Sequence, residues 1–542
     1  MGGEIAGEKC GKGGRRPTLL RCSADPEALG STLSRSSSRL PAASEGGSRR
    51  CSARCSLSGV SFPDPSDPGL LSPAQTSLLA DQYEFAMAAS YLQRGMNEPA
   101  VFELFARHLP RHRHWLLVAG LGPALRLVEA MRFDDAELAY LASLGFRREF
   151  LEYLSGFRFS GDVDAMPEGT LAFAGEPLLR VTAPRIQAQL LETLLLNQIN
   201  FQTAIATKAA RIVLAAGRGR PGAGGRVIDF SPRRDHGVDA SVKAARAAVI
   251  AGAAGTSNVA AAMRYGLEPV GTMAHSYVMS FEQEQAAFRA FMEDTPENAV
   301  LLVDTYDTID GIRHAIAASR ATGVPLQGVR LDSGDLLVLS RQARRLLDDA
   351  GMRATRIVAS GDLDEEQIAR LAAQGAPIDV WGVGTELGTS RDSPTVGGVY
   401  KLVADRAPDG SWRGVAKLSP AKATVPGPKQ VFRHSRDGTM VADVIAAADE
   451  RLDGMSLLVP AMRDGAMVLS ETLATMRERA AAALSALPAE LRLTTPGTPP
   501  DAYPVRYSER LRNLEPFACA DTADHCAPPV ETVPPAAKGV SQ

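Results

Sequence analysis

Residues 327–335, with the sequence QGVRLDSGD, combine the two features on which a fold assignment for this chain depends. The first half, residues 327–331, is a mostly apolar run of the length of a buried β-strand. The second half, residues 332–335, is small and polar, as is typical where a strand ends in a turn. Five other runs have the same β-rich character: residues 226–230, 270–273, 299–303, 356–359 and 378–381.

Amphipathic helical segments separate these runs, and the later runs recur every ~20 to 30 residues, the length of one βα unit. This alternation predicts an α/β fold with a parallel sheet, either open or closed into a barrel. Right-handed crossovers place the carboxyl ends of all the strands on one side of such a sheet. The residues just after each strand are therefore expected to converge on a common site.

A polar cluster follows each predicted strand, where that common site would lie. Each cluster carries small, charged or hydroxyl side chains within a few residues of the end of the strand. The six clusters are FSPRRDHG at 230–237, GTMAHS at 271–276, DTYD at 304–307, RLDSGD at 330–335, SGD at 360–362 and GVGT at 382–385.

Two of these clusters, residues 360–362 and 382–385, are dominated by small residues between a predicted strand and a predicted helix. Glycine allows the backbone to approach a ligand closely at such places, and free amide groups can bind a phosphate. Tight βα turns also use glycine, so either cluster alone would favour a simple turn. Their occurrence on adjacent strands favours a phosphate site.

Three aspartates, Asp304, Asp332 and Asp362, lie just after predicted strands. Their carboxylates would meet at one edge of the sheet, which suits ribose hydroxyls or a hydrated Mg²⁺ that carries diphosphate. The alternative is that they cap the following helices, a common position for aspartate.

His275 lies between alanine and serine at the end of a predicted strand. A neutral imidazole at this position can accept a proton or a phosphoryl group. A single histidine is more often a structural residue, so the residue types alone leave its role open.

Composition narrows the class of protein. A length of 542 residues exceeds that of a usual single core, so more than one domain is expected. The net charge of −3 gives no reason to expect a nucleic acid as a partner, and the sequence predicts no membrane-spanning helix.

All six cysteines lie near the termini, which argues against disulfides or thiolate metal sites in the body of the chain. Residues 1–70 and 516–542 are predicted to be disordered, because they lack a sustained apolar period.

Together with residues 330–335, four further segments resemble the nicotinate phosphoribosyltransferase family between about residues 78 and 514. These segments are ADQYEFAM at 80–87, residues 191–203, GTSN at 255–258, and Lys417 with PGPKQ at 426–430.

The resemblance implies an α/β fold built around an irregular parallel α/β barrel at residues 211–405. A mixed α+β N-terminal domain would occupy residues 71–210, and C-terminal segments at 406–515 would pack back on it and complete it. The resemblance further implies a cytoplasmic homodimer with shared active sites, because Tyr83 in this family reaches into the neighbouring subunit's site.

The same resemblance implies the chemistry of two residues. His275 would be catalytic as a phosphohistidine, phosphorylated by ATP so that ATP hydrolysis is coupled to nucleotide formation. Asp332 would be the second catalytic residue, near the ribose. Asp304, from its position after a predicted strand, would hold the Mg²⁺ cofactor together with Asp332.

The remaining implied roles concern the two other substrates, nicotinate and phosphoribosyl diphosphate. Tyr83 and Phe230 would hold the pyridine ring between them, and Arg330 would pair with its carboxylate. The phosphoribosyl diphosphate would be contacted by Arg233, Thr256, Ser360, Gly361, Asp362, Gly384, Thr385 and Arg391.

Substrate choice depends on Ser257, since related nicotinamide-using enzymes have an aspartate after the same Gly-Thr pair. Aspartate would repel a carboxylate, whereas serine can donate to it, so nicotinate is favoured over nicotinamide. Quinolinate phosphoribosyl transfer is a further alternative, although it would call for a more cationic pocket and no His275. A non-catalytic phosphoribosyl- or pyridine-binding regulator is the alternative outside enzymes. The pair Ser231-Pro232 departs from the family pattern and leaves the backbone placement of Phe230 and Arg233 open.

Overall fold

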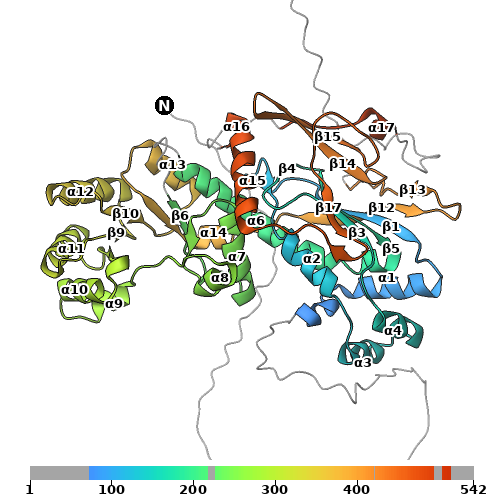
Figure 1. Ribbon diagram of the computed structural model, residues 1–542, viewed down its shortest axis with the longest axis horizontal. Coiled ribbons are helices and arrows are strands. Elements are labelled where there is room, and N and C mark those ends of the chain that lie inside the picture. The colour runs from blue at the N-terminus through green and yellow to red at the C-terminus, as the bar shows by residue number, and fades with distance from the viewer. Residues whose placement is uncertain (1–72, 218–225, 420–421, 493–502, 514–542) are drawn as a thin grey trace, which may run out of the picture. The chain divides into compact units, whose positions relative to one another are not determined.

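The computed structural model describes residues 73–217, 226–419, 422–492 and 503–513 (Figure 1). The predicted disorder of residues 1–70 and 516–542 therefore lies outside the described residues. Within the described part, no helix has both the length and the apolar character required to cross a membrane.

A parallel sheet of six strands holds the segments that the sequence predicts to carry the site. Every neighbouring pair of strands in it runs parallel. The strands are largely buried, as expected for a sheet covered by helices on its faces. In spatial order they are β7 (Gly255–Thr256), β6 (Arg226–Asp229), β11 (Val380–Val383), β10 (Arg356–Ala359), β9 (Gly328–Leu331) and β8 (Val300–Leu302).

Helices alternate with these strands along the chain, which confirms the predicted α/β class (Figure 1). Aspartate or asparagine side chains cap several of them: Asn258, Asp307, Asp335 and Asp364 accept hydrogen bonds from amides of the first turn. The helices are α7 (Val238–Ile250), α8 (Val259–Tyr265), α9 (His275–Met279), α10 (Glu284–Asp294), η2 (Pro296–Asn298), α11 (Thr308–Thr322), α12 (Leu336–Asp349), α13 (Glu365–Ala373) and α14 (Thr385–Gly388).

One predicted strand is wrong. Residues 270–273 form no strand; the second strand is the two-residue β7, and Pro269 makes a single bridge to Thr256. Pro269 has no N–H to donate and Gly271 has a low strand propensity, which accounts for the loss of the ladder. In the described residues, β7 and β8 are the two edge strands of this sheet, and residues 270–273 make one hydrogen bond toward each of them. Val270 N donates to Thr256 O of β7 at 2.9 Å. Asn298 Nδ2, which lies just before β8, donates to Gly271 O at 2.8 Å. A closed barrel therefore stays a prediction.

Two further sheets contain C-terminal segments: a seven-stranded antiparallel sheet that also holds N-terminal strands, and a four-stranded sheet made of C-terminal strands alone, in which β15 and β19 run parallel. In the seven-stranded sheet, β12 and β17 pair with β1 and β3 of the N-terminal part. That sheet has the order β13 (Trp412–Gly414), β12 (Gly398–Arg406), β1 (Pro99–Ala106), β5 (Pro177–Pro184), β3 (Asp162–Ala165), β17 (Val459–Arg463) and β18 (Ala466–Met467). The four-stranded sheet has the order β16 (Met455–Ser456), β14 (Lys429–Arg436), β15 (Thr439–Ala447) and β19 (Val505–Tyr507).

The remaining elements are short or flank these sheets. They are β2 (Leu116–Leu117), which pairs with β4 (Leu171–Ala172), and the helices η1 (Pro73–Leu78), α1 (Gln82–Gln93), α2 (Leu121–Ala130), α3 (Asp135–Ser143), α4 (Arg148–Ser155), α15 (Leu473–Ala486), α16 (Ala489–Arg492) and α17 (Glu509–Arg512).

Helix α6 (Glu192–Ala216) connects the antiparallel and the parallel sheet regions (Figure 1). It contacts α2 and β12 of the first region and α7 and α13 of the second. The sequence predicts one helix over residues 186–213. The structure divides this segment into α5 (Arg185–Gln189) and α6, with the break at the buried Leu190 and Leu191. Helix α6 places Lys208 against Glu386 and Asp392 of the segment that follows β11.

Candidate functional site

His275 is the first residue of α9 and lies opposite the carboxyl ends of β8 and β9. Its Nδ1 atom is 3.1 Å from the hydroxyl of Thr305. Its Nε2 atom is 4.0 Å from Asp304 Oδ1 and 3.9 Å from Asp332 Oδ2. The side chain is 40% exposed, so a ligand can reach an imidazole that faces two carboxylates.

Asp304 is held rigidly behind this histidine. Its buried side chain accepts from the backbone amide of Asp332 at 2.9 Å and from the hydroxyl of Ser333 at 2.7 Å, both at Oδ2. Its Oδ1 atom is buried and has no hydrogen-bond partner among the described residues. A buried carboxylate oxygen without a donor is costly, so this atom is available to a cation.

Asp332 accepts at Oδ1 from Arg330 Nη2 at 2.6 Å and from the Ser360 hydroxyl at 2.5 Å. Burial alone would raise the pKa of Asp332, but the Ser360 hydrogen bond and the Arg330 charge outweigh it, and the net pKa is lowered. Asp332 is therefore ionised at neutral pH. The capping alternative fails for Asp304, Asp332 and Asp362, because Asp307, Asp335 and Asp364 cap the helices that follow.

Arg330 is fixed from three sides. It donates from Nε to Ser360 Oγ at 2.8 Å as well as to Asp332, and its guanidinium lies 5.4 Å from the centroid of the Phe230 ring. A Cβ atom on Gly382 would lie 2.4 Å from two Phe230 ring atoms, so glycine is required there to accommodate the ring. An aromatic face and a cationic fork thus lie side by side, as recognition of an aromatic carboxylate requires.

The turn after β10 brings a glycine close to the neighbouring strand end. Gly361 has φ +92°, and a Cβ on it would lie 2.0 Å from the Asp332 carbonyl oxygen, so only glycine fits. Asp362 also has a left-handed backbone, with φ +44°. After β11, Gly384 approaches the Phe230 carbonyl and Thr385 begins α14. The structure therefore brings Ser360, Gly361, Asp362, Gly384 and Thr385 to the same edge as Arg330 and Asp332.

Two carboxylates at and just after the end of β6 have a place in the site that their positions in the sequence did not predict. Asp229 accepts from the Thr256 hydroxyl at 2.8 Å and the Ser231 amide at 2.9 Å, and burial raises its pKa. Asp235 accepts from the Ser231 hydroxyl at 3.1 Å. Burial, followed by the charge of Asp229, raises the pKa of Asp235 to about 6. The sequence feature that could have pointed to Asp229 is a charged residue at the end of a four-residue strand, after its two apolar residues.

Ser231, the residue that departs from the family pattern, has a defined place in this group. It is fully buried and bridges the two carboxylates. A Cβ on Gly388 would lie 1.9 Å from Asp235 Oδ1 and 2.4 Å from Ser231 Cβ, so the α14 turn packs directly on the bridge.

Four predicted site residues are less constrained. Arg233 is exposed, and Arg391 is exposed with an ion pair to Glu386 at 3.1 Å. Ser257 follows Thr256 and donates its backbone amide to the Asp229 carbonyl at 2.8 Å. Tyr83 lies on α1, where burial and the charge of Glu192 raise its pKa to about 12. No interaction among the described residues connects Tyr83 to Phe230.

The oxygen ligands fit a magnesium ion better than a softer metal. Among the described residues, no group of three or more His, Cys, Asp or Glu side chains could hold a metal ion by itself. Mg²⁺ is commonly bound by one or two carboxylates together with substrate phosphates. The unpartnered Oδ1 of Asp304 and the ionised Asp332 are suitable donors of this kind.

The fold and the site define an α/β protein with a ligand site at the carboxyl edge of a parallel sheet. Residues 78–200 match the N-terminal domain of nicotinate phosphoribosyltransferase, and residues 226–404 match the nicotinate phosphoribosyltransferase family. The chain therefore belongs to the nicotinate phosphoribosyltransferase family.

Individual relatives agree with this assignment. A nicotinate phosphoribosyltransferase of Mycobacterium tuberculosis is 47% identical over 83% of this chain and 95% of its own length. The enzyme of Bacillus subtilis is 44% identical over 70% of this chain and 78% of its own length. The crystal structure of human nicotinic acid phosphoribosyltransferase has a TM-score of 0.70 at 30% sequence identity, covering 80% of this chain and 99% of that chain.

Proposed function

We propose that this chain transfers the 5-phosphoribosyl group of 5-phosphoribosyl 1-diphosphate to nicotinate, giving nicotinate mononucleotide and diphosphate in NAD salvage. The observation that carries the proposal is the contact of Arg330 with both Phe230 and Asp332. The guanidinium would bind the carboxylate of nicotinate while the ring stacks on Phe230. The adjacent Asp332 would then face the ribose.

In this reaction the pyridine nitrogen forms a bond to C1 of the ribose as the bond from C1 to the diphosphate oxygen breaks. The diphosphate leaves with both electrons, and no covalent enzyme intermediate is needed. Catalysis then depends on alignment and on charge. The ionised Asp332 would stabilise positive charge that develops on the sugar, and Arg233 and Arg391 would neutralise the departing diphosphate.

The phosphate of the ribose would bind the backbone and hydroxyl groups of the two glycine turns. Gly361 and Gly384 allow the chain to pass close to a ligand, and both follow adjacent strands. Ser360, Asp362, Thr385 and Thr256 would supply the hydroxyl and carboxylate contacts. Support comes from the shared edge of the sheet on which these residues lie.

Mg²⁺ would be held by Asp304 and Asp332 together with the diphosphate. When bound, it would supply charge neutralisation to the leaving group. His275, close to both carboxylates, would accept a phosphoryl group from ATP, which couples ATP hydrolysis to nucleotide formation. The half-exposed imidazole, anchored by Thr305 at 3.1 Å, supports this role.

Tyr83 would act in the site of a second copy of the chain, since it is 47% exposed and lies apart from Phe230. A homodimer with shared active sites would bring it to the pyridine. In the same family framework, the segment between Pro269 and His275 would close the sheet into an irregular barrel.

A direct assay tests the proposed function. Pure full-length protein would be incubated with phosphoribosyl diphosphate, Mg²⁺ and one of three pyridines, nicotinate, nicotinamide or quinolinate, with and without ATP, and the product identified by mass spectrometry. We expect nicotinate mononucleotide as the main product and an increased yield with ATP. Turnover of quinolinate with release of CO₂, or no product from any of the three pyridines, would contradict the proposal.

A further inference from the structure

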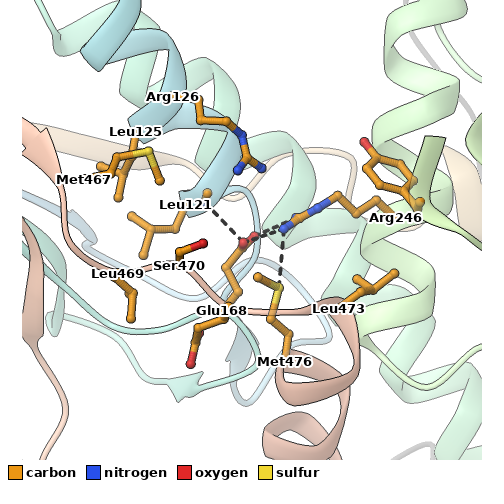
Figure 2. A pocket seen from close by; sticks show the side chains of 13 residues that line it. Leu121, Leu125, Arg126, Glu168, Arg246, Met467, Leu469, Ser470, Leu473 and Met476 are labelled. Atoms are coloured by element: carbon orange, nitrogen blue, oxygen red, sulfur yellow. Dashed lines mark hydrogen bonds and ion pairs between the residues drawn. The ribbon is translucent and has the colours of Figure 1, made fainter.

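A pocket of about 210 Å³ lies apart from the predicted site residues (Figure 2). Its walls come from three parts of the chain: α2 with Glu168, the helices α7 and α8, and the segment 467–476 that leads into α15. The pocket is open to solvent, so a small molecule can enter it at the place where these three parts of the chain meet.

One wall of this pocket is apolar. It carries aliphatic and thioether side chains, which adapt readily to an alkyl group. These residues are Leu121, Leu125, Met467, Leu469, Leu473 and Met476.

Beside these apolar side chains lies a buried ion pair whose charges already cancel, and its Arg246 also contacts the Met476 sulfur at 3.4 Å. Arg246 donates to the two oxygens of Glu168 at 2.8 and 2.6 Å, and both residues are almost fully buried. The Glu168 carboxylate also accepts from the backbone amides of Gly120 and Gly122. Burial alone would raise the pKa of Glu168, but these donors lower it, so the carboxylate is ionised and has no need of a second cation.

Arg126 is exposed to solvent beside the pocket and supplies a positive charge that no carboxylate of the described residues pairs with. Figure 2 shows its guanidinium directed toward the Glu168–Arg246 pair. A Cβ atom on Gly122 would lie 3.7 Å from Nη2 of both Arg126 and Arg246, so the two guanidinium groups converge. Within the described part of the chain Arg126 has no hydrogen bond or ion pair, and the other carboxylate of the pocket, Glu471, pairs with Arg479 at 3.0 Å.

Two hydroxyl groups add neutral donors to the polar side. Tyr265 is the last residue of α8, and Ser470 precedes Glu471. Burial raises the pKa of Tyr265, so its hydroxyl keeps its proton at neutral pH and can donate it.

We propose that this pocket binds a small organic monoanion with an aliphatic body. Its carboxylate would pair with Arg126 and accept from Tyr265, while its alkyl chain would lie against the leucine and methionine wall. Such a ligand would contact all three parts of the chain that form the pocket. Because it would bind only the folded protein, it would also raise the temperature of unfolding.

Hexanoate is a suitable probe, since it has the charge and the alkyl chain but no aromatic ring for Phe230. Isothermal titration of the full-length protein should show saturable binding of hexanoate. Acetate lacks the alkyl chain and 1-hexanol lacks the carboxylate, so each should bind more weakly than hexanoate by about tenfold or more. Arg126→Leu should weaken hexanoate binding by a similar factor, and Tyr265→Phe should weaken it to a smaller extent.

Arg148→Leu is the matched control, because this arginine is also on a short helix. Its side chain is 82% exposed, so its replacement should not disturb folding. It should bind hexanoate as the unaltered protein does. Circular dichroism would verify that each variant is folded. Absence of saturable binding, an Arg126→Leu variant with unchanged affinity, or displacement of hexanoate by nicotinate would overturn the proposal, the last by placing the probe in the other site.

Discussion

Arg330 and Asp332 project from the same face of the parallel sheet, and their side chains form an ion pair of 2.6 Å. Residues two apart along a strand share a face, so the local sequence itself brings the pair together. Ser360 of the adjacent strand end bonds to both members, at 2.8 and 2.5 Å. The guanidinium is thus held beside Phe230 before any ligand arrives.

Replacing Arg330 tests this preorganisation. Arg330→Gln should raise the KM for nicotinate by roughly 10- to 100-fold, because a charge-assisted hydrogen bond to the carboxylate is lost. The KM for phosphoribosyl diphosphate should change less. Steady-state kinetics measures both. Arg356→Gln, at the exposed start of the adjacent strand β10, is the control and should leave both constants unchanged. An unaltered KM for nicotinate in Arg330→Gln would show that Arg330 does not bind the carboxylate of nicotinate.

His275 tests the coupling to ATP. His275→Ala should abolish nicotinate-dependent ATP hydrolysis and lower the yield of nucleotide, while nicotinate binding survives because Phe230 and Arg330 are untouched. The measurement is the ratio of ADP to nucleotide formed. His314→Ala, which removes a half-exposed histidine bonded to Glu284 at 2.7 Å, serves as the control. The same ADP-to-nucleotide ratio in His275→Ala and the unaltered protein would contradict the role.

Ser257 tests selectivity. Ser257→Asp should lower kcat/KM for nicotinate and raise it for nicotinamide, because a new carboxylate repels one substrate and accepts from the amide of the other. Ser257→Asn, which adds bulk without charge, is the matched control. A ratio of the two kcat/KM values that moves equally in both variants would show that size, not charge, decides.

The strands and their end clusters could be predicted because the signals are local. β6, β8, β9, β10 and β11 all coincide with predicted apolar runs to within a few residues. β7 has two residues, too few for a period to be visible. The failed strand at 270–273 shows that apolar character is not sufficient beside Pro269 and Gly271.

Side-chain networks could not be predicted in this way, since they depend on packing between distant segments. Lys208 looks like an ordinary helix residue in the sequence. In the structure it is 1% exposed and lies 2.6 Å from Glu365 and 2.9 Å from Asp392. It also approaches Glu386 at 3.5 Å, the residue that pairs with Arg391.

This network predicts that Lys208 positions the segment after β11. Lys208→Met should lower the free energy of unfolding by about 1–3 kcal/mol, because Glu365 and Asp392 lose one buried partner while Arg211 and Arg113 still pair with them. It should also raise the KM for phosphoribosyl diphosphate, since Glu386 is then free to shift Arg391. Lys243→Met removes a pair with the exposed Asp239 and should cost no more than about 1 kcal/mol. Urea denaturation and kinetics measure the two effects, and equal losses in the two variants would rule out a special role for Lys208.

Asp235 predicts a pH dependence of stability. Burial and the charge of Asp229 raise its pKa in the folded protein from 3.8 to about 6. Between these two values the folded state binds more protons than the unfolded state, so this group lowers stability as the pH rises through the window. Asp235→Asn keeps an oxygen that accepts from Ser231 but cannot ionise. The variant should therefore lose less stability between pH 4 and pH 6 than the unaltered protein, as measured by urea denaturation at a series of pH values. Asp310→Asn, on the exposed face of α11, should retain the original slope, and an identical slope in Asp235→Asn would show that Asp235 does not titrate in this range.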